Sequence, residues 1–428
     1  MTTRSQSSGR FTVRDRRALF LMSLVAFVSG YGASAISHTL PFARNALELS
    51  EGGMFWIFGI TRAASLAGLF FAIAADRGGR RDPLLIAFAL IPTGNLLTGL
   101  LPHPVVFAVT QSVTRIGVVA VAALAVVILS EELTPGRRAF GIGIYALAGS
   151  MGAGLGLLIL PLAERGDDVW RILFGAAALG LLVLPLLNRF LNESRAYAPA
   201  SKSGDFSEVL ASGAGRYFFL LAGMAFFIAA FASPAFDFVL ERLINDLEWS
   251  TSSATLLLVV FSGIGTVGLL VGGRMADVTG RRITTVVAIV LGVVGGVAFY
   301  FVSTGPLLAA AVFLGTLGAT MLTPAVAAHR AELFPTRIRA TAAGMITNVA
   351  IVGSMTGFIL GALVVDSIGL PRTISLLSIG LIASIWMVLQ LPETKGKDLV
   401  SFTSELTALD ASGGTWGDST VRTTTESF

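Results

Sequence analysis

Twelve stretches of roughly twenty predominantly apolar residues recur along this chain of 428 residues. A helix of about 20 apolar residues can cross ~30 Å of hydrocarbon. Only 13% of the residues are charged, against about 25% in soluble proteins. We therefore predict an all-α integral membrane protein with twelve spans. The predicted spans lie near residues 18–41, 53–75, 83–101, 104–131, 139–163, 170–191, 216–240, 251–275, 283–303, 306–329, 340–365 and 371–391.

Lysine and arginine are unevenly distributed between the two ends of these spans. Of the 30 such residues, 23 lie in the termini or around the loops that follow spans 2, 4, 6, 8 and 10, and five lie on the opposite side. Loops rich in Lys and Arg stay in the cytoplasm. We expect both termini to be cytoplasmic, the membrane to be the plasma membrane, and the first span to be retained rather than cleaved as a signal peptide. The net charge of +4 suits anionic lipid better than nucleic acid.

A polar segment in the middle of the chain separates six predicted spans from the other six. We expect a cytoplasmic N-terminal tail at 1–17, a six-helix half at 18–191, and a cytoplasmic linker at 192–215. A second six-helix half would follow at 216–397, and a disordered cytoplasmic tail, rich in Ser, Thr and Gly, at 398–428.

Four short features recur 200 or 201 residues apart, one copy in each half. "ADRGGRR", ending at Arg81, is echoed by "ADVTGRR", ending at Arg282. "EELTPGRR" is echoed by "AELFPTRIR", "NES" by "PET", and Gly152 with Gly156 by Gly353 with Gly357. Such spacing predicts a duplicated six-helix unit. Because six is even, the two copies enter the membrane in the same orientation and are related by a pseudo-two-fold axis along its normal.

On these motifs the chain resembles the major facilitator superfamily of secondary transporters, from its first span to about Lys397. "ADRGGRR" and "ADVTGRR" resemble the family's loop between helices 2 and 3 and its copy between helices 8 and 9. "WR" at 170–171, "ELFPTRIR" at 332–339 and "PETKG" at 392–396 resemble the sugar-porter and metabolite:proton symporter branches. Gly32 stands where sugar porters usually carry Asp, and helix 7 lacks the paired glutamines of a sugar site, so we do not expect a hexose as substrate.

The resemblance implies that the repeated loops form a cytoplasmic gate. Its charges would latch the gate when the carrier opens outward and separate when it opens inward. Exposed ion pairs are worth only ~0.2–1 kcal/mol each, which suits a latch that must open. The alternative is that the arginines only orient the protein. The predicted gate residues are Asp76, Arg80, Arg81, Glu132, Arg137, Glu193, Asp277, Arg281, Arg282, Glu332, Arg337 and Glu393.

Two arginines lie deep inside predicted spans, where a charge costs at least ~2.5–3.5 kcal/mol. Arg62 and Arg115 both fall near mid-membrane, and Gln111 lies one turn before Arg115. Helices 1 to 6 contain no mid-membrane Asp or Glu. Three explanations stay open: an anionic substrate supplies the counter-charge, the arginines brace their half through backbone carbonyls or waters, or they take part in proton movement.

Other polar or aromatic residues inside the spans are further candidates for the substrate or coupling site. Asp237, near the outer end of helix 7, could carry a proton if buried, or could be a solvated outer-gate residue near Glu241 and Arg242. Threonines and the asparagine could instead bond a neighbouring helix. The remaining candidates are Tyr31, Ser34, Phe227, Phe231, Thr316, Thr320 and Asn348.

We predict a monomeric, alternating-access carrier that moves a small and anionic organic metabolite and is coupled to protons. The chain has no cysteine, three histidines and no nucleotide-binding loop, so we expect no metal, no cofactor and no ATP-driven step. We find no catalytic cluster and do not expect an enzyme. The alternatives are efflux of a drug or natural product by proton antiport, and a non-transporting, carrier-like membrane sensor.

Overall fold

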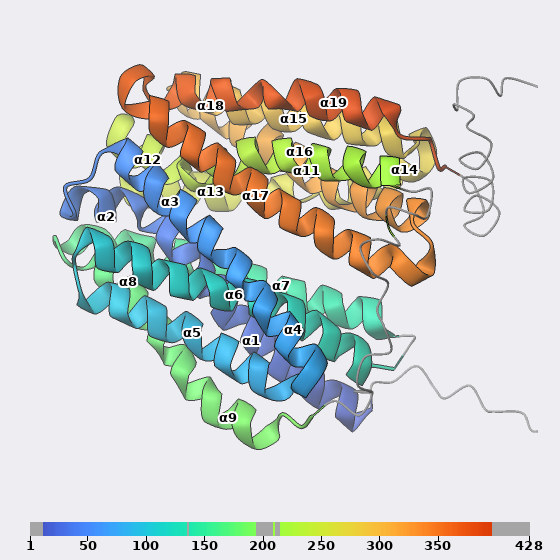
Figure 1. Cartoon of the computed structure of the whole chain (residues 1–428). Coiled ribbons are helices and arrows are strands. Elements are labelled where there is room, and N and C mark those ends of the chain that lie inside the picture. The colour runs from blue at the N-terminus through green and yellow to red at the C-terminus, as the bar shows by residue number, and fades with distance from the viewer. Residues whose placement is uncertain (1–11, 135–136, 194–208, 210–214, 396–428) are drawn as a thin grey trace, which may run out of the picture. The chain divides into compact units, whose positions relative to one another are not determined.

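The computed structural model describes residues 12–134, 137–193, 209 and 215–395 (Figure 1). The predicted linker, apart from a few residues at its ends and Val209, lies outside these ranges, as do the tail at 398–428 and most of the tail at 1–17. The chain divides into two compact units. One unit comprises residues 1–201 with 237–259, and the other comprises 202–236 with 260–428. The segment 237–259, which lies in the second half of the sequence, therefore packs within the first unit.

The first unit is built from the first six spans, the end of the seventh and the start of the eighth. Several spans are interrupted by short turns of 3₁₀ helix, and the seventh ends in a turn of π-helix at Arg242–Asp246. Its helices are α1 Val13–His38, α2 Leu40–Ala46, α3 Glu51–Ser65, α4 Leu69–Gly78, α5 Arg81–Leu100, α6 Pro104–Glu132, α7 Arg138–Leu158, α8 Trp170–Ala177, α9 Val183–Phe190 and α12 Val239–Glu241.

The second unit holds the rest of the seventh and eighth spans and the four spans that follow. α11 and α13 each run from one unit into the other along the chain. Its helices are α11 Gly215–Asp237, α13 Thr251–Gly265, α14 Gly268–Thr279, α15 Arg281–Phe301, α16 Gly305–Leu333, α17 Thr336–Ile368, α18 Leu370–Ser378 and α19 Gly380–Gln390.

Twelve helical segments in the described part of the chain are long and apolar enough to cross a membrane, and each overlaps a predicted span. The largest difference is at the seventh, which runs on to Asp246 instead of ending near 240. The first begins at Val13 rather than 18, because Thr12 and Asp15 form a capping box there. The prediction of a twelve-helix all-α membrane protein is confirmed.

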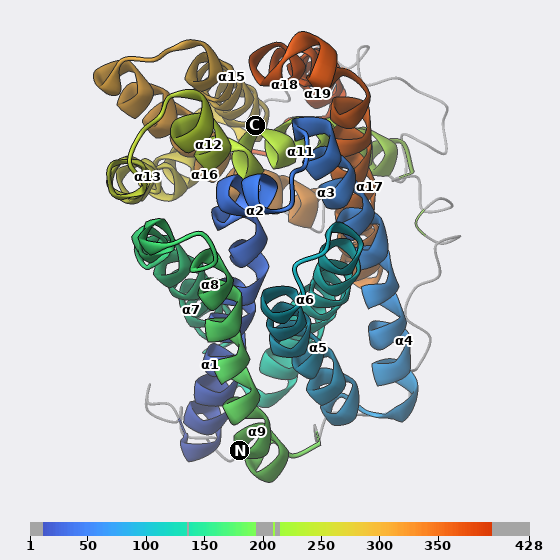
Figure 2. The ribbon, with the colours of Figure 1, turned by 90° about the vertical axis from the view of Figure 1, so that its left-hand side faces the viewer.

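Within the first unit, α1 packs along α6 and α7, and α5 packs along α6 and α8. Figure 2 shows α1 beside α7 and α5 beside α6. A Cβ added at Gly152 of α7 would collide with the carbonyl oxygen of Phe27 in α1, so glycine is needed for this close approach. The same contact recurs in the second unit, between Gly353 of α17 and the carbonyl of Phe226 in α11. The repeated glycines thus mark an equivalent helix pair inside each unit.

Candidate functional site

The loop between α4 and α5 holds a carboxylate on the backbone at the start of α5. Gly79 has a φ of 103°, and a Cβ there would lie 2.5 Å from Oε2 of Glu193, so glycine is required on both counts. The amides of Arg80 and Arg81 donate to the two oxygens of Glu193, at 2.6 and 3.2 Å. A carboxylate suits the amino end of a helix, where backbone N–H groups lack helical partners. Glu193 therefore ties the end of the sixth span to the third.

The side chain of Arg80 then connects the loop to α6. Its guanidinium donates to the carbonyl of Ala75 at 2.7 Å and lies 3.3 Å from Asp76, whose side chain is largely exposed. It also pairs with Glu131 at 3.2 Å. Arg81 donates to backbone carbonyls at the end of α9, including that of Leu191 at 2.9 Å. These contacts all lie within the first unit.

Glu132 does not face this loop. Both of its carboxylate oxygens accept from Arg14 of α1 at 2.6 Å, and the neighbouring Glu131 is the partner of Arg80. The sequence motifs match Glu332 with Glu132, but the residue of the first unit that makes the equivalent contact is Glu131, one position earlier. Successive residues of a helix point about 100° apart, so two adjacent glutamates face different neighbours, and an offset of 200 or 201 residues cannot distinguish them.

The second unit repeats the arrangement. Gly280 has a φ of 112°, and the amides of Arg281 and Arg282 donate to Glu393 at 2.9 and 3.0 Å. The guanidinium of Arg281 lies 3.3 Å from Asp277 and makes a two-point contact with Glu332, at 2.8 and 3.1 Å. In the part of the chain that is described, each loop cluster thus closes on its own unit.

Glu393 also accepts backbone bonds from the two residues that follow it. Thr394 and Lys395 also donate their amides to it, at 3.0 and 3.1 Å. Partial burial alone would raise the pKa of the Glu393 carboxyl, but the backbone N–H groups that face it outweigh burial and lower that pKa below its usual range. Glu393 is therefore held as a carboxylate at neutral pH.

Two predicted gate residues remain to be placed, Arg137 and Arg337. Arg137 precedes the first residue of α7. The backbone of Arg337 belongs to α17, and its side chain lies outside the described part of the structure.

Arg62 and Asp237 form a buried ion pair in the first unit. The guanidinium of Arg62 donates to Oδ2 of Asp237 at 2.7 Å, and Ser37 of α1 donates to Oδ1, also at 2.7 Å. Only 6% of the Asp237 side chain and 18% of the Arg62 side chain are exposed. The interpretation of Asp237 as a solvated residue is wrong, and Arg62 has an internal counter-charge after all. Sequence reasoning missed this pairing because the two residues lie 175 positions apart in chain order.

Arg115 has no such partner. It is half-buried in α6 and interacts electrostatically with both Arg62 and Asp237. It makes no hydrogen bond or ion pair with any residue that the structure describes. Two guanidinium groups thus share the neighbourhood of one carboxylate, which leaves a net positive charge inside the span region.

The other candidates of the first unit bond neighbouring helices. The Gln111 amide donates to Thr98 of α5 at 2.8 Å, and Asn95 of α5 donates to the carbonyl of Gly32 in α1 at 3.4 Å. The hydroxyl of Tyr31 donates to the carbonyl of Leu173 at 2.7 Å, while Ser34 donates to its own helix. Because buried polar groups need partners in an apolar interior, these residues support the helix packing. Asn95 and Thr98 were not predicted, although both interrupt an apolar span.

The candidates of the second unit also serve mainly as packing groups. Phe231 lies against Gly296 of α15, and Phe227 against Gly380 of α19. Thr320 donates to the carbonyl of Gly265 at 2.9 Å, where α13 ends, and Thr316 lies against the same glycine. Asn348 is half-buried, without a hydrogen bond to any described residue.

A second ion pair of the first unit was not predicted. Glu241 is fully buried, lies 3.0 Å from Arg44 and accepts from Asn245 at 2.8 Å. Asn45 in turn donates to Asn245 at 3.2 Å. Residues 237–246 are therefore tied to α2 and α3 by charged and amide side chains, in addition to the stacking of Phe238 on Phe55.

Twelve apolar helices, duplicated loop motifs and charged groups inside the spans define a multi-pass membrane transporter. The chain belongs to the Major Facilitator Superfamily, whose family profile matches residues 22–305 and 218–417. The family and the related proteins are transporters, so the chain is a secondary transporter and not an enzyme.

Individual relatives are distant. A citrate-proton symporter of Klebsiella pneumoniae is 25% identical over 288 residues, which are 61% of this chain and 63% of the relative. The chain thus spans less than two thirds of that protein. A candidate metabolite transport protein of Haemophilus influenzae is 24% identical over 84% of this chain and 89% of its own length.

Solved structures share the fold. An inward-facing, unoccupied bacterial homologue of the human lysosomal transporter Spinster has a TM-score of 0.70 at 18% identity, covering 94% of this chain and 98% of that one. A D-xylose-proton symporter has a TM-score of 0.71 at 18% identity, covering 90% and 99%. At this identity the likeness concerns the fold alone.

Proposed function

We propose that this transporter moves a small organic anion together with protons. The observation that carries the proposal is the charge imbalance around Arg115. Arg62 and Arg115 are both inside spans, Asp237 pairs with Arg62, and Arg115 pairs with no described residue. An uncompensated cation inside a membrane is costly. A bound carboxylate or phosphate would supply the missing negative charge.

Arginine is well suited to this role. The guanidinium group presents its donors in a fixed plane that matches the two oxygens of a carboxylate. The half-buried Arg115 keeps its donors available, whereas Arg62 already donates to Asp237. We assign Arg115 to substrate recognition. The bracing interpretation is better supported for Arg62, which joins α3 to the end of the seventh span.

Proton coupling is assigned to Asp237. Its two oxygens accept from Arg62 and Ser37, so its protonation would remove the charge attraction that holds Arg62. Arg62 would then be released towards a substrate anion that binds near Arg115. Binding of the anion and protonation of Asp237 would in this way favour each other, which is the condition for symport.

The relatives support the same substrate class. The K. pneumoniae protein is named for citrate, a tricarboxylate, and for the proton. We further propose that the carrier is monomeric, lies in the plasma membrane and has both termini in the cytoplasm, since most of its Lys and Arg residues fall on that side. The two loop clusters would then line the cytoplasmic gate.

Substrate recognition is tested by thermal unfolding of the purified protein with citrate, malate, phosphate, xylose and a bulky cationic drug. A ligand that binds only the native state raises the unfolding temperature. We expect one of the anions to stabilise the wild type and Arg115→Gln to abolish the shift. Arg274→Gln is the matched control, because Arg274 is an exposed arginine inside the eighth span.

Stabilisation by xylose, or stabilisation by the cationic drug that survives Arg115→Gln, would overturn the anion proposal. Stabilisation by the drug alone would favour efflux by proton antiport. A loss of the anion shift in Arg274→Gln as well would show that the shift reports overall charge rather than a site.

Proton coupling is tested in proteoliposomes with the anion that stabilises the protein. Asp237→Asn keeps the shape of the side chain and removes its charge, so we expect uptake driven by a pH gradient to be lost and exchange of substrate across the membrane to continue. Gradient-driven uptake by Asp237→Asn at the wild-type rate would assign the proton to another group.

A further inference from the structure

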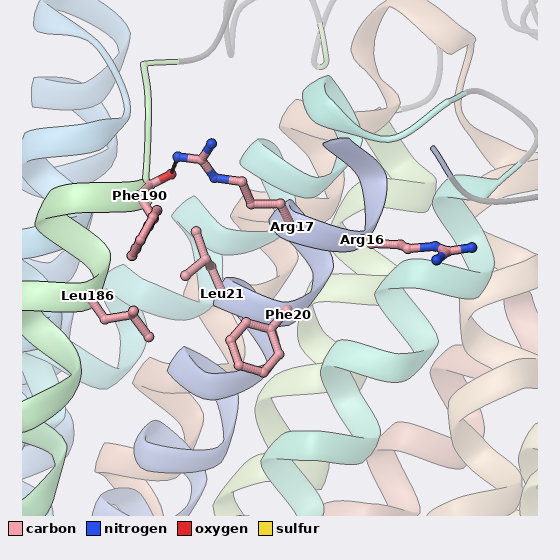
Figure 3. Close-up of a pocket in the computed structure, with 6 residues that line it drawn as sticks. All are labelled: Arg16, Arg17, Phe20, Leu21, Leu186 and Phe190. Carbon is pink, nitrogen blue, oxygen red and sulfur yellow. Dashed lines mark hydrogen bonds between the residues drawn. The ribbon is translucent and has the colours of Figure 1, made fainter. Parts of the chain in front are cut away.

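A groove on the first unit combines an apolar floor with arginines at one end (Figure 3). It runs between α1 and α9 and has a volume of about 460 Å³. Its walls are formed by Phe20 and Leu21 of α1 and by Leu186 and Phe190 of α9. Phe20 is 59% exposed and Phe190 is 39% exposed, so the groove opens on the outside of the unit.

Arginines gather where α1 begins and α9 ends. In Figure 3 Arg17 extends from α1 towards Phe190, and its guanidinium donates to the carbonyl of Phe190. Arg189 lies over the same ring, with its guanidinium carbon 5.4 Å from the ring centre. Arg16 lines the rim and points away from Phe190. These three arginines form no ion pair with a carboxylate that the structure describes.

Most donors of this cluster are therefore available. A guanidinium has five N–H donors, and Arg17 uses only one recorded bond, which caps the end of α9. Nearby acidic groups are engaged elsewhere, since Glu132 binds Arg14 and Asp15 caps its own helix. The positive charge at the end of the groove consequently has no partner within the described chain.

A second groove along α9 shows that the charge is not a general property of this helix. It is lined by Leu85, Leu184, Pro185 and Asn188 and carries no charged residue. Of these two grooves, only the one beside α1 is also lined by cations.

The internal repeat gives a further comparison. The carbonyls of Phe27 and Phe226 make equivalent contacts in the two units. Counting back along the chain from each of them, Arg216 corresponds to Arg17 and Gly215 to Arg16. Arg81 and Arg282 donate to the carbonyls of Asn188 and Leu389, which places Gln390 at the position of Arg189. The second unit thus keeps one of the three arginines, so the cluster is specific to the first unit.

We propose that this groove binds one anionic phospholipid. The headgroup phosphate binds Arg17 and Arg189, with Arg16 at the rim, because guanidinium groups match phosphate oxygens. An acyl chain lies along Phe20, Leu186 and Phe190. The arginines stand at the end of a predicted span, which is the depth of the headgroups. The lipid joins the first and sixth spans, and the site does not depend on the identity of the transported substrate.

The test is native mass spectrometry of the protein in a neutral detergent, with equal amounts of phosphatidylglycerol and phosphatidylcholine of identical acyl chains. We expect the wild type to retain phosphatidylglycerol preferentially. Each arginine removed should weaken retention by about 5-fold, and Arg17→Gln with Arg189→Gln together by about 25-fold. Arg216→Gln is the matched control and should bind phosphatidylglycerol as the wild type does.

Arg17 also caps α9, so its removal could disturb the helix itself. The pair Arg16→Gln and Arg189→Gln leaves that bond in place and should still lose the preference. Unchanged retention of phosphatidylglycerol in this pair and in the Arg17→Gln, Arg189→Gln pair would overturn the proposal, as would an equal loss in Arg216→Gln. Displacement of the lipid by glycerol 3-phosphate would identify a site for soluble phosphate and would also overturn it.

Discussion

The loop cluster of the first unit and that of the second are built from the same motif but are not equally well held. Glu193 accepts the amides of Arg80 and Arg81 and is exposed, whereas Glu393, which accepts the matching amides of Arg281 and Arg282, is partly buried. Arg80 reaches Glu131 through one recorded bond. Arg281, by contrast, contacts Glu332 through two.

This difference separates two functions of one motif. The glycine, the two amides and the glutamate are common to both copies, so they serve the local task of joining spans within a unit. In the second copy Glu332 also accepts the hydroxyl of Thr394, whereas the residues after Glu193 lie outside the described part of the chain. From the two-point contact of Arg281 with Glu332 and the greater burial of Glu393, we infer that the second cluster is the firmer brace and that the first is better suited to rearrange during transport.

The strongest test of this contrast is removal of each glutamate. Glu393→Ala leaves four amides without their acceptor, and hydrogen bonds to charged groups are worth about 1.5–3 kcal/mol each without being additive, so we expect a loss of about 3 kcal/mol. Glu193→Ala should have a smaller effect, because Glu193 is exposed and Glu393 is partly buried. Denaturant unfolding in detergent measures both, and equal losses would remove the distinction between the two copies.

Replacement of arginine by lysine probes the two-point contact. Lysine keeps the charge but cannot present two parallel donors, so Arg281→Lys should destabilise the protein by about 1–2 kcal/mol through the lost bonds to Glu332. Arg80→Lys should cost less, because its recorded contact with Glu131 is a single bond. A larger loss of stability in Arg80→Lys than in Arg281→Lys would mean that the first cluster is the firmer brace and the second the looser one.

The register of α6 is tested by its two terminal glutamates. We expect Glu131→Gln to destabilise the loop cluster by about 1 kcal/mol, because it removes the charged partner of the largely buried Arg80. Glu132→Gln acts on the pair with Arg14, whose side chain is 42% exposed, and should cost less than about 1 kcal/mol. Unfolding midpoints of the two variants decide which glutamate belongs to the cluster.

The smallest expected effect is on the pH dependence of stability. The pKa of Glu393 is lowered in the folded protein, so its contribution is complete above the ordinary glutamate pKa of about 4.3 and declines as the pH falls through the lower folded pKa. The difference in unfolding temperature between wild type and Glu393→Gln should thus be constant from pH 7 to 5 and shrink below about pH 4. A difference that already changes near neutral pH would contradict this assignment.

Much of the fold and some of the site could be predicted because they depend on local or repeated patterns. Apolar length fixed the spans, and the 201-residue repeat indicated that Arg80 and Arg281 have equivalent surroundings. The loops close within each unit, however, and the partner of Arg80 is Glu131, which a linear match of motifs did not identify. The burial of Asp237 could not be predicted either, because the position of a residue near the end of a span does not show what covers its side chain.

The sequence by itself determined the membrane class, the helices and the duplicated motifs, since these follow from hydrophobic length and from residue types at fixed spacing. Only the tertiary structure decided which charges meet. Arg62 pairs with Asp237 because residues 237–259 pack within the first unit, and Arg115 is left without a described partner as a result. Such pairings join residues far apart in the chain, and their energy depends on distance and burial, which sequence spacing does not encode.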